Sequence, residues 1–167
     1  MDKEHTCCFT GHRPDKLPWG TDEEDPRCLA LKARLTDALE EEYRTGTRHF
    51  ICGMARGADL YFAEAVLAMR ERLPGVTLEC ARPCESQAHS WPQKEQARYQ
   101  SILDRCDFET LVQHHYDRGC MARRNRYMVD HAARLIGVYD GVPKGGTAQT
   151  VLYALRKGLH LNLLPVL

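Results

Sequence analysis

The stretch LIGVYDGVPKGGT, residues 135–147, decides the fold, because it predicts a buried strand that runs into a helix through a glycine-rich turn. Its first five residues form a short apolar run, typical of a strand inside a parallel sheet. Thr147 is a good helix N-cap, and apolar side chains recur at helical spacing after it. We therefore expect a strand over residues 135–139 and a helix from Thr147 to about Gly158.

The turn between this strand and this helix has the composition of an anion-binding site. Asp140 and Gly141 end the strand, while Gly145 and Gly146 allow backbone conformations closed to other residues and let a ligand approach the main chain. Unpaired N–H groups and the positive end of the helix dipole would face a group held there. Phosphate is the ligand that this arrangement favours, although glycines are also common in plain strand-to-helix turns.

Strand-like and helix-like segments alternate along the whole chain. The other expected strands cover residues 6–10, 49–52, 76–80, 108–112 and 161–166. The other expected helices cover about residues 25–43, 58–73, 91–106 and 121–133. Such alternation implies right-handed crossovers with helices on both faces of a sheet. The sequence therefore predicts an α/β fold, a Rossmann-like three-layer sandwich with a mainly parallel central sheet. No linker or repeat divides residues 1–167, so we expect one domain.

The unusual loops of the chain all follow expected strands. In a parallel sheet of this kind, ligands bind outside the carboxyl ends of the strands, where the strand order reverses. One composite pocket accounts for these loops better than separate sites do. The loops cover residues 11–14, 53–59, 83–91, 114–125 and 140–147.

Several polar side chains in these loops suit a phosphate or a nucleoside. Arg13 offers a planar fork of donors suited to phosphate, or it is a surface arginine. Asp59 either caps the following helix or accepts hydrogen bonds from a ribose. Arg124 and Asn125 form a pocket wall, or they take part in a structural ion pair with Asp130.

Two aromatic residues and two glycines complete this set. Trp91 and Tyr116 either stack on a base or pack into the core. Gly53 and Gly57 would let their loop pass close to a ligand.

Composition narrows the range of partners. The chain carries 23 Lys and Arg against 23 Asp and Glu, so we do not expect extended nucleic-acid binding. The N-terminus lacks a signal-peptide layout and no apolar run is long enough for a membrane span, so we expect a cytoplasmic protein with no membrane partner. A homo-oligomer remains open.

The eight cysteines and eight histidines do not have the spacing of metal ligands. No Cys-x-x-Cys pair occurs, and His114 and His115 are adjacent and cannot share a helical face. We interpret the cysteines as buried, reduced thiols that pack as small apolar side chains. We assign no metal and no cofactor.

Five motifs together resemble the YpsA-like proteins of the SLOG superfamily. They are FTGHRP at 9–14, CGMARGADLYFAE at 52–64, the set Pro83, Gln87, Trp91 and Tyr99, RRNRYMVD at 123–130, and VYDGVPKGGT at 138–147. The superfamily also includes LOG-type phosphoribohydrolases and DprA-type DNA-processing proteins. The resemblance implies a Rossmann-like fold with a pocket for a nucleotide or a nucleotide-derived ligand. The candidate ligand-binding residues are Gly11, His12, Arg13, Gly53, Met54, Gly57, Asp59, Arg124, Asn125, Asp140, Gly141, Gly145, Gly146 and Thr147.

The chain departs from the LOG-type enzymes at the residue on which their hydrolysis depends. Those enzymes resemble this chain in their glycine-rich turn but place a glutamate soon after it, where this chain has Gln149. Glutamine cannot act as a general base or stabilise an oxocarbenium ion by charge. Glu64 and Asp140 are the substitutes to consider. We therefore favour a protein that binds or senses a nucleotide-like small molecule, with phosphate at residues 145–147 and contacts from Arg13 and Arg124.

Two alternatives stand beside this hypothesis. The first is a LOG-like phosphoribohydrolase that cleaves the N-glycosidic bond of a nucleoside 5′-monophosphate. The second, a DprA-like DNA-associated module, is disfavoured by the zero net charge and by the absence of an appended domain.

Overall fold

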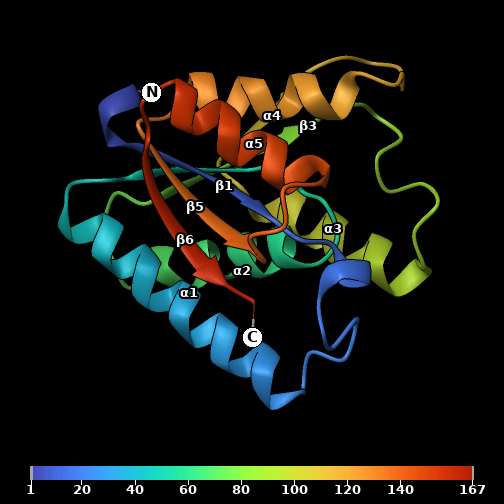
Figure 1. Ribbon diagram of the computed structural model, residues 1–167, viewed down its shortest axis with the longest axis horizontal. Coiled ribbons are helices and arrows are strands. Elements are labelled where there is room, and N and C mark those ends of the chain that lie inside the picture. The colour runs from blue at the N-terminus through green and yellow to red at the C-terminus, as the bar shows by residue number, and fades with distance from the viewer. Residues whose placement is uncertain (1, 167) are drawn as a thin grey trace.

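Six strands pair side by side in one sheet of the computed structural model, which describes residues 2–166 (Figure 1). Along the sheet their order is β4-β3-β2-β1-β5-β6, and every pairing is parallel. The predicted Rossmann-like α/β fold is thereby confirmed. The strands are β1 (Thr6–Gly11), β2 (His49–Cys52), β3 (Thr77–Arg82), β4 (Phe108–Leu111), β5 (Arg134–Tyr139) and β6 (His160–Pro165).

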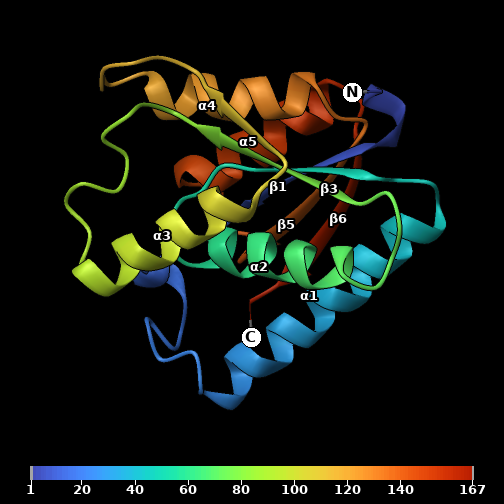
Figure 2. The ribbon, with the colours of Figure 1, turned by 180° about the vertical axis from the view of Figure 1, so that it is seen from behind.

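Five α-helices occur among the described residues, and they cover both faces of the sheet (Figures 1 and 2). On one face lie α1 (Pro26–Arg44), α2 (Ala58–Arg70) and α3 (Gln93–Arg105). On the other face lie α4 (Cys120–Asp130) and α5 (Gly145–Arg156). Two short 3₁₀ turns, η1 (Lys3–His5) and η2 (Pro14–Lys16), flank β1. No helix among residues 2–166 is both long and apolar enough to cross a membrane.

Successive side chains of β1 point to opposite faces of the sheet and so belong to two separate layers of the core. Cys7 and Phe9 face α1–α3, where Phe9 stacks on Phe62 of α2 with ring centroids 4.5 Å apart. Cys8 faces α4 and α5. All eight cysteines are free thiols, and seven of them are buried. Their burial agrees with the interpretation that they pack as small apolar side chains.

The strand order reverses between β1 and β5. From β1 the chain proceeds towards β2, whereas from β5 it proceeds towards β6 on the opposite side. The two strands stay in register up to the pair Gly11 and Val138, after which their loops separate. A crevice for ligands is expected at this point of such a sheet.

The start of α5 differs from the predicted one. The helix begins at Gly145 with Lys144 as its N-cap residue, so Thr147 lies inside the first turn and does not cap it. Gly145 has φ +90°, a conformation that favours glycine, and this allows the chain to enter the helix early. As a result, the backbone N–H groups of residues 145–147 all belong to the open first turn of α5.

Candidate functional site

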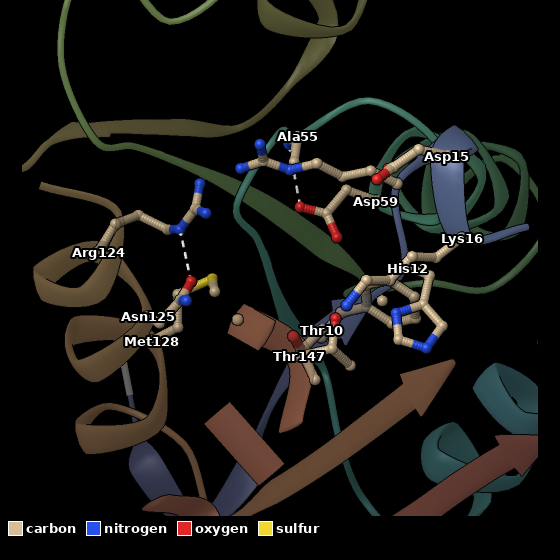
Figure 3. Close-up of a pocket in the computed structure, with 14 residues that line it drawn as sticks. Thr10, His12, Asp15, Lys16, Ala55, Asp59, Arg124, Asn125, Met128 and Thr147 are labelled. Atoms are coloured by element: carbon tan, nitrogen blue, oxygen red, sulfur yellow. Dashed lines mark hydrogen bonds between the residues drawn. The ribbon is translucent and has the colours of Figure 1, made fainter. Parts of the chain in front are cut away.

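A cavity of about 280 Å³ lies at the strand-order reversal (Figure 3). Figure 3 shows Arg124, Asn125 and Met128 of α4 on one side, and Thr10 of β1 with His12 and Lys16 of the following segment on the other. Segments far apart in the sequence thus meet at one place, as the composite-pocket hypothesis requires. The remaining lining residues are Phe9, Gly11, Arg13, Asp15, Ala55, Asp59, Gly146 and Thr147.

His12 ties the first loop to its neighbours. Its backbone N–H donates to Val138 O at 3.3 Å, and its carbonyl accepts from Ala58 N at 3.1 Å. Its ring Nε2 accepts from the Asp140 N–H at 3.1 Å, and the whole side chain is buried. A hydrogen bond from the Val142 N–H holds the pKa of Asp140 below its usual value. These contacts occupy His12 and Asp140 within the protein.

Two cations border the cavity on its β1 side. Arg13 is exposed, and its side chain forms no hydrogen bond or ion pair with any residue from 2 to 166. Lys16 stretches towards the start of α5, where its Nζ lies 3.5 Å from the Lys144 carbonyl oxygen. The sequence interpretation missed Lys16. No sequence motif includes it, and only the structure shows that the 3₁₀ turn η2 aligns it with Arg13, three residues before it.

Arg124 is buried and held by its own chain. One guanidinium nitrogen donates to the Gly53 carbonyl, and Nε donates to Asn125 Oδ1 at 2.8 Å. A Cβ on Gly53 would lie 2.8 Å from this guanidinium, so Gly53 makes room for Arg124. The alternative ion pair with Asp130 is not formed, since Asp130 accepts from Tyr153 instead.

Two other candidates in the second loop lie behind the cavity wall. Met54 is fully buried in the core at φ 63°. Gly57 has φ +85°, and a Cβ there would come within 2.8 Å of His12 O. Gly11 acts similarly, since its Cβ would meet Ala58 Cβ at 2.7 Å. These residues allow the loops to approach one another closely.

Asp59 is the buried carboxyl group of the cavity wall. One of its oxygens accepts from the Ala55 N–H at 3.0 Å, so it fixes the loop before α2 and does not cap that helix. Burial raises the pKa of Asp59 to about 6, against the lowering influence of Arg124, the Ala55 amide and Arg13. Its charge therefore changes within the physiological pH range.

The α5 side of the cavity consists of backbone. A Cβ on Gly146 would meet no atom within 4 Å, so this residue opens directly into the cavity beside Thr147. A Cβ on Gly145 would lie 2.6 Å from Lys16 Nζ. Gly141, at φ +83°, belongs to the turn above and does not line the cavity. Among the described residues, no group of three or more His, Cys, Asp or Glu side chains is placed to hold a metal ion.

The chain matches one family model along most of its length. A family model named YpsA matches residues 7–163, and its description reads “YspA SLOG family”. The chain belongs to the YpsA family of SLOG proteins. The resemblance seen in the motifs is thereby confirmed. Similar proteins include a UPF0398 protein of Bacillus pumilus, 27% identical over 141 residues that cover 81% of this chain and 75% of that protein. The prophage-derived protein YoqJ of Bacillus subtilis is 28% identical over 144 residues, covering 78% of this YpsA-family chain and 84% of YoqJ.

A solved structure with the same fold corrects one expectation. DNA processing protein A of Helicobacter pylori superposes with a TM-score of 0.61 at 18% identity, covering 98% of this YpsA-family chain and 66% of the other. That structure is described as showing a single-stranded DNA binding mode. The expectation that extended nucleic-acid binding does not suit this chain was therefore wrong. A net charge of zero describes the whole surface and does not exclude local cations such as Arg13 and Lys16.

Gln149, which stands where the LOG-type glutamate is expected, and Glu64, one of its possible substitutes, both lie away from the cavity. Gln149 is exposed on α5, beside Asn125 and Arg126 in a separate shallow hollow. Glu64 is paired with Arg98, whose Nη2 lies 2.6 Å from its Oε1. Neither side chain lines the cavity, so the only carboxyl groups there among the described residues are those of Asp15 and Asp59.

Proposed function

We propose that this YpsA-family protein binds or senses a nucleotide or a nucleotide-derived ligand, whose phosphate lies at the first turn of α5. One observation carries the proposal. The open backbone at Gly146 and Thr147 faces the same cavity as Arg13 and Lys16, neither of which has a carboxylate partner among the described residues. Backbone N–H groups at a helix N-terminus and side-chain cations together provide what a phosphate requires.

The direct test is thermal unfolding with a panel of mononucleotides, dinucleotides and short oligonucleotides. A ligand that binds only the native state raises the melting temperature, and the shift grows with ligand concentration. We expect a saturable shift with at least one phosphate-bearing compound and none with the matching nucleoside. The absence of any shift at millimolar concentrations would contradict the proposal.

Phosphoribohydrolase activity is the second candidate, and Asp59 is the observation that favours it. A buried carboxyl group with a raised pKa in a cavity is the kind of group that serves as a general acid. However, it is committed to the Ala55 N–H, and no second carboxylate in the described cavity is buried with it. We therefore expect nucleoside monophosphates to yield no free base by chromatography. Release of base that Asp59→Asn abolishes would instead establish the enzyme.

The pKa of Asp59 also predicts how ligand affinity depends on pH. Above about pH 6 its carboxylate is ionised and repels a phosphate in the same cavity, and below pH 6 it is neutral. Affinity should rise as the pH falls through 6, roughly tenfold for each unit by which the bound phosphate raises the Asp59 pKa.

Calorimetry between pH 5 and 8 with a pyrophosphate-linked dinucleotide measures this dependence, because the charge of its phosphates is constant over that range. Asp59→Asn should give a flat profile. An unchanged slope in the Asp59→Asn protein would show that another group is responsible.

A further inference from the structure

A second cavity, of about 570 Å³, adjoins the first on the far side of Arg13. The two cavities share Arg13, Asp15 and Ala55 as lining residues. The second is bordered by the loop between β3 and α3 and by the segment before α4. Arg13 thus stands between two adjoining hollows and faces both of them.

Aromatic rings border the second cavity. Trp91 is half-buried and held in place by an edge-to-face contact with Tyr99, with ring centroids 5.2 Å apart. Its carbonyl also accepts from Gln96 Nε2 at 2.9 Å. Tyr116, by contrast, is 64% exposed and its hydroxyl has no partner among residues 2–166. A packed ring and an exposed ring over one hollow suit the stacking of a nucleobase.

The walls of the two cavities are joined at one carbonyl group. Gly53 O accepts from Arg124, which lines the first cavity, and from Gln87 Nε2 at 3.0 Å, which lines the second. Gln87 Oε1 in turn accepts from Tyr99 OH at 2.8 Å, the ring on which Trp91 rests. The relative position of the two hollows is therefore fixed by buried hydrogen bonds.

A second cation faces the larger cavity. Arg56 Nε is buried without a hydrogen-bond partner, and its ion-pair contact with Glu95 is long at 3.7 Å. Together with Arg13, it places positive charge at the rim of a hollow that also holds the hydroxyl groups of Ser86 and Ser90. A nucleotide offers a ring, hydrogen-bonding edges and an anion to such a set.

We infer that the ligand is a dinucleotide, with one nucleotide in each cavity and the linking phosphates at Arg13. This inference rests on the proposed function, since it takes the phosphate at the first turn of α5 as one of the linking phosphates. The cavity with Trp91 and Tyr116 is the base subsite for the second nucleotide.

The test uses Trp91 as a reporter. The chain has two tryptophans, and Trp19 is buried in the core outside both cavities. A pyrophosphate-linked diadenosine dinucleotide should quench the fluorescence of the wild-type protein, and the quench should vanish in Trp91→Phe. Calorimetry should show that it binds at least about tenfold more tightly than adenosine monophosphate, because stacking of a second base adds to affinity. Equal affinities, or no quench, would overturn the inference.

Inorganic pyrophosphate and two variants separate this inference from the proposed function. Tyr116→Ala and Trp91→Ala should each weaken dinucleotide binding roughly tenfold while leaving pyrophosphate binding unchanged. Because Tyr116 is exposed, its replacement by alanine should leave the packing of the core unchanged. If pyrophosphate binds but both variants bind the dinucleotide like wild type, the second subsite is wrong and the first stands. If neither pyrophosphate nor any nucleotide binds, both are wrong.

Thymidine oligomers of increasing length test for a longer ligand. Affinity that keeps rising with oligomers longer than two nucleotides would show that a single strand is the ligand and would overturn the dinucleotide.

Discussion

Gly146→Val is expected to weaken the affinity for the ligand by about a hundredfold or more while leaving the protein folded. The valine side chain would extend into open space, because a Cβ at this position meets nothing within 4 Å, and Gly146 does not have a positive φ. That space is the part of the cavity in which the phosphate would accept from the backbone N–H groups of α5. Loss of one charge-assisted hydrogen bond of roughly 1.5–3 kcal/mol weakens affinity about ten- to a hundredfold, and loss of two such bonds accounts for a change of a hundredfold or more.

The matched control is Gln149→Val. It introduces the same side chain in the same helix, but at an exposed position outside the cavity. Calorimetry should show wild-type affinity for Gln149→Val and an affinity at least about a hundredfold lower for Gly146→Val. Both proteins should give the circular dichroism spectrum of the wild type. A folded Gly146→Val protein with wild-type affinity would place the phosphate elsewhere.

Arg124→Ala is expected to lower the free energy of unfolding by about 3 kcal/mol, a large share of the stability of a domain of this size. The guanidinium is buried, and it donates to Gly53 O and to Asn125 Oδ1. Its removal leaves a hollow beside the Gly53 loop as well as lost hydrogen bonds. Weaker ligand binding would follow from this loosening and not from a lost contact with phosphate.

Urea denaturation measures this effect, with Arg126→Ala as the control. Arg126 lies two residues further along α4 and is exposed, so its replacement should change stability by no more than about 0.5 kcal/mol. Equal stability of the two variants would show that Arg124 does not hold the loop. In that case Arg124 would be available to contact the ligand directly, as predicted from the sequence.

The fold could be predicted from the sequence because its signals are local. Strands are predicted by apolar runs such as residues 135–139, and helices are predicted by apolar spacing such as that in α1. A chain in which strands and helices alternate can adopt only a few sheet topologies. The end of β3 was predicted too early because pairing with β4, which carries β3 on to Arg82, is not visible in the local pattern. Thr147 was taken as an N-cap because its residue type suits that position, whereas the glycine conformation at 145 moved the helix start.

The candidate site was less predictable because a residue's type does not reveal its partner. Gly53 packs closely against Arg124, and Gly57 packs closely against His12. These contacts depend on how loops distant in the sequence meet, which the sequence does not show. Arg124 has the chemistry of a phosphate ligand but is occupied by a backbone carbonyl. Lys16 was missed because no motif includes it, although η2 carries it to the start of α5.

The measurement that tests the central claim most directly is an NMR titration of the ¹⁵N-labelled protein with inorganic pyrophosphate. If phosphate binds at the first turn of α5, the amide signals of Gly145, Gly146 and Thr147 should shift first and furthest, together with that of Arg13. Amides further along α5, after Gln149, should move little. Shifts that saturate elsewhere on the protein, with the signals of residues 145–147 unmoved, would contradict the account.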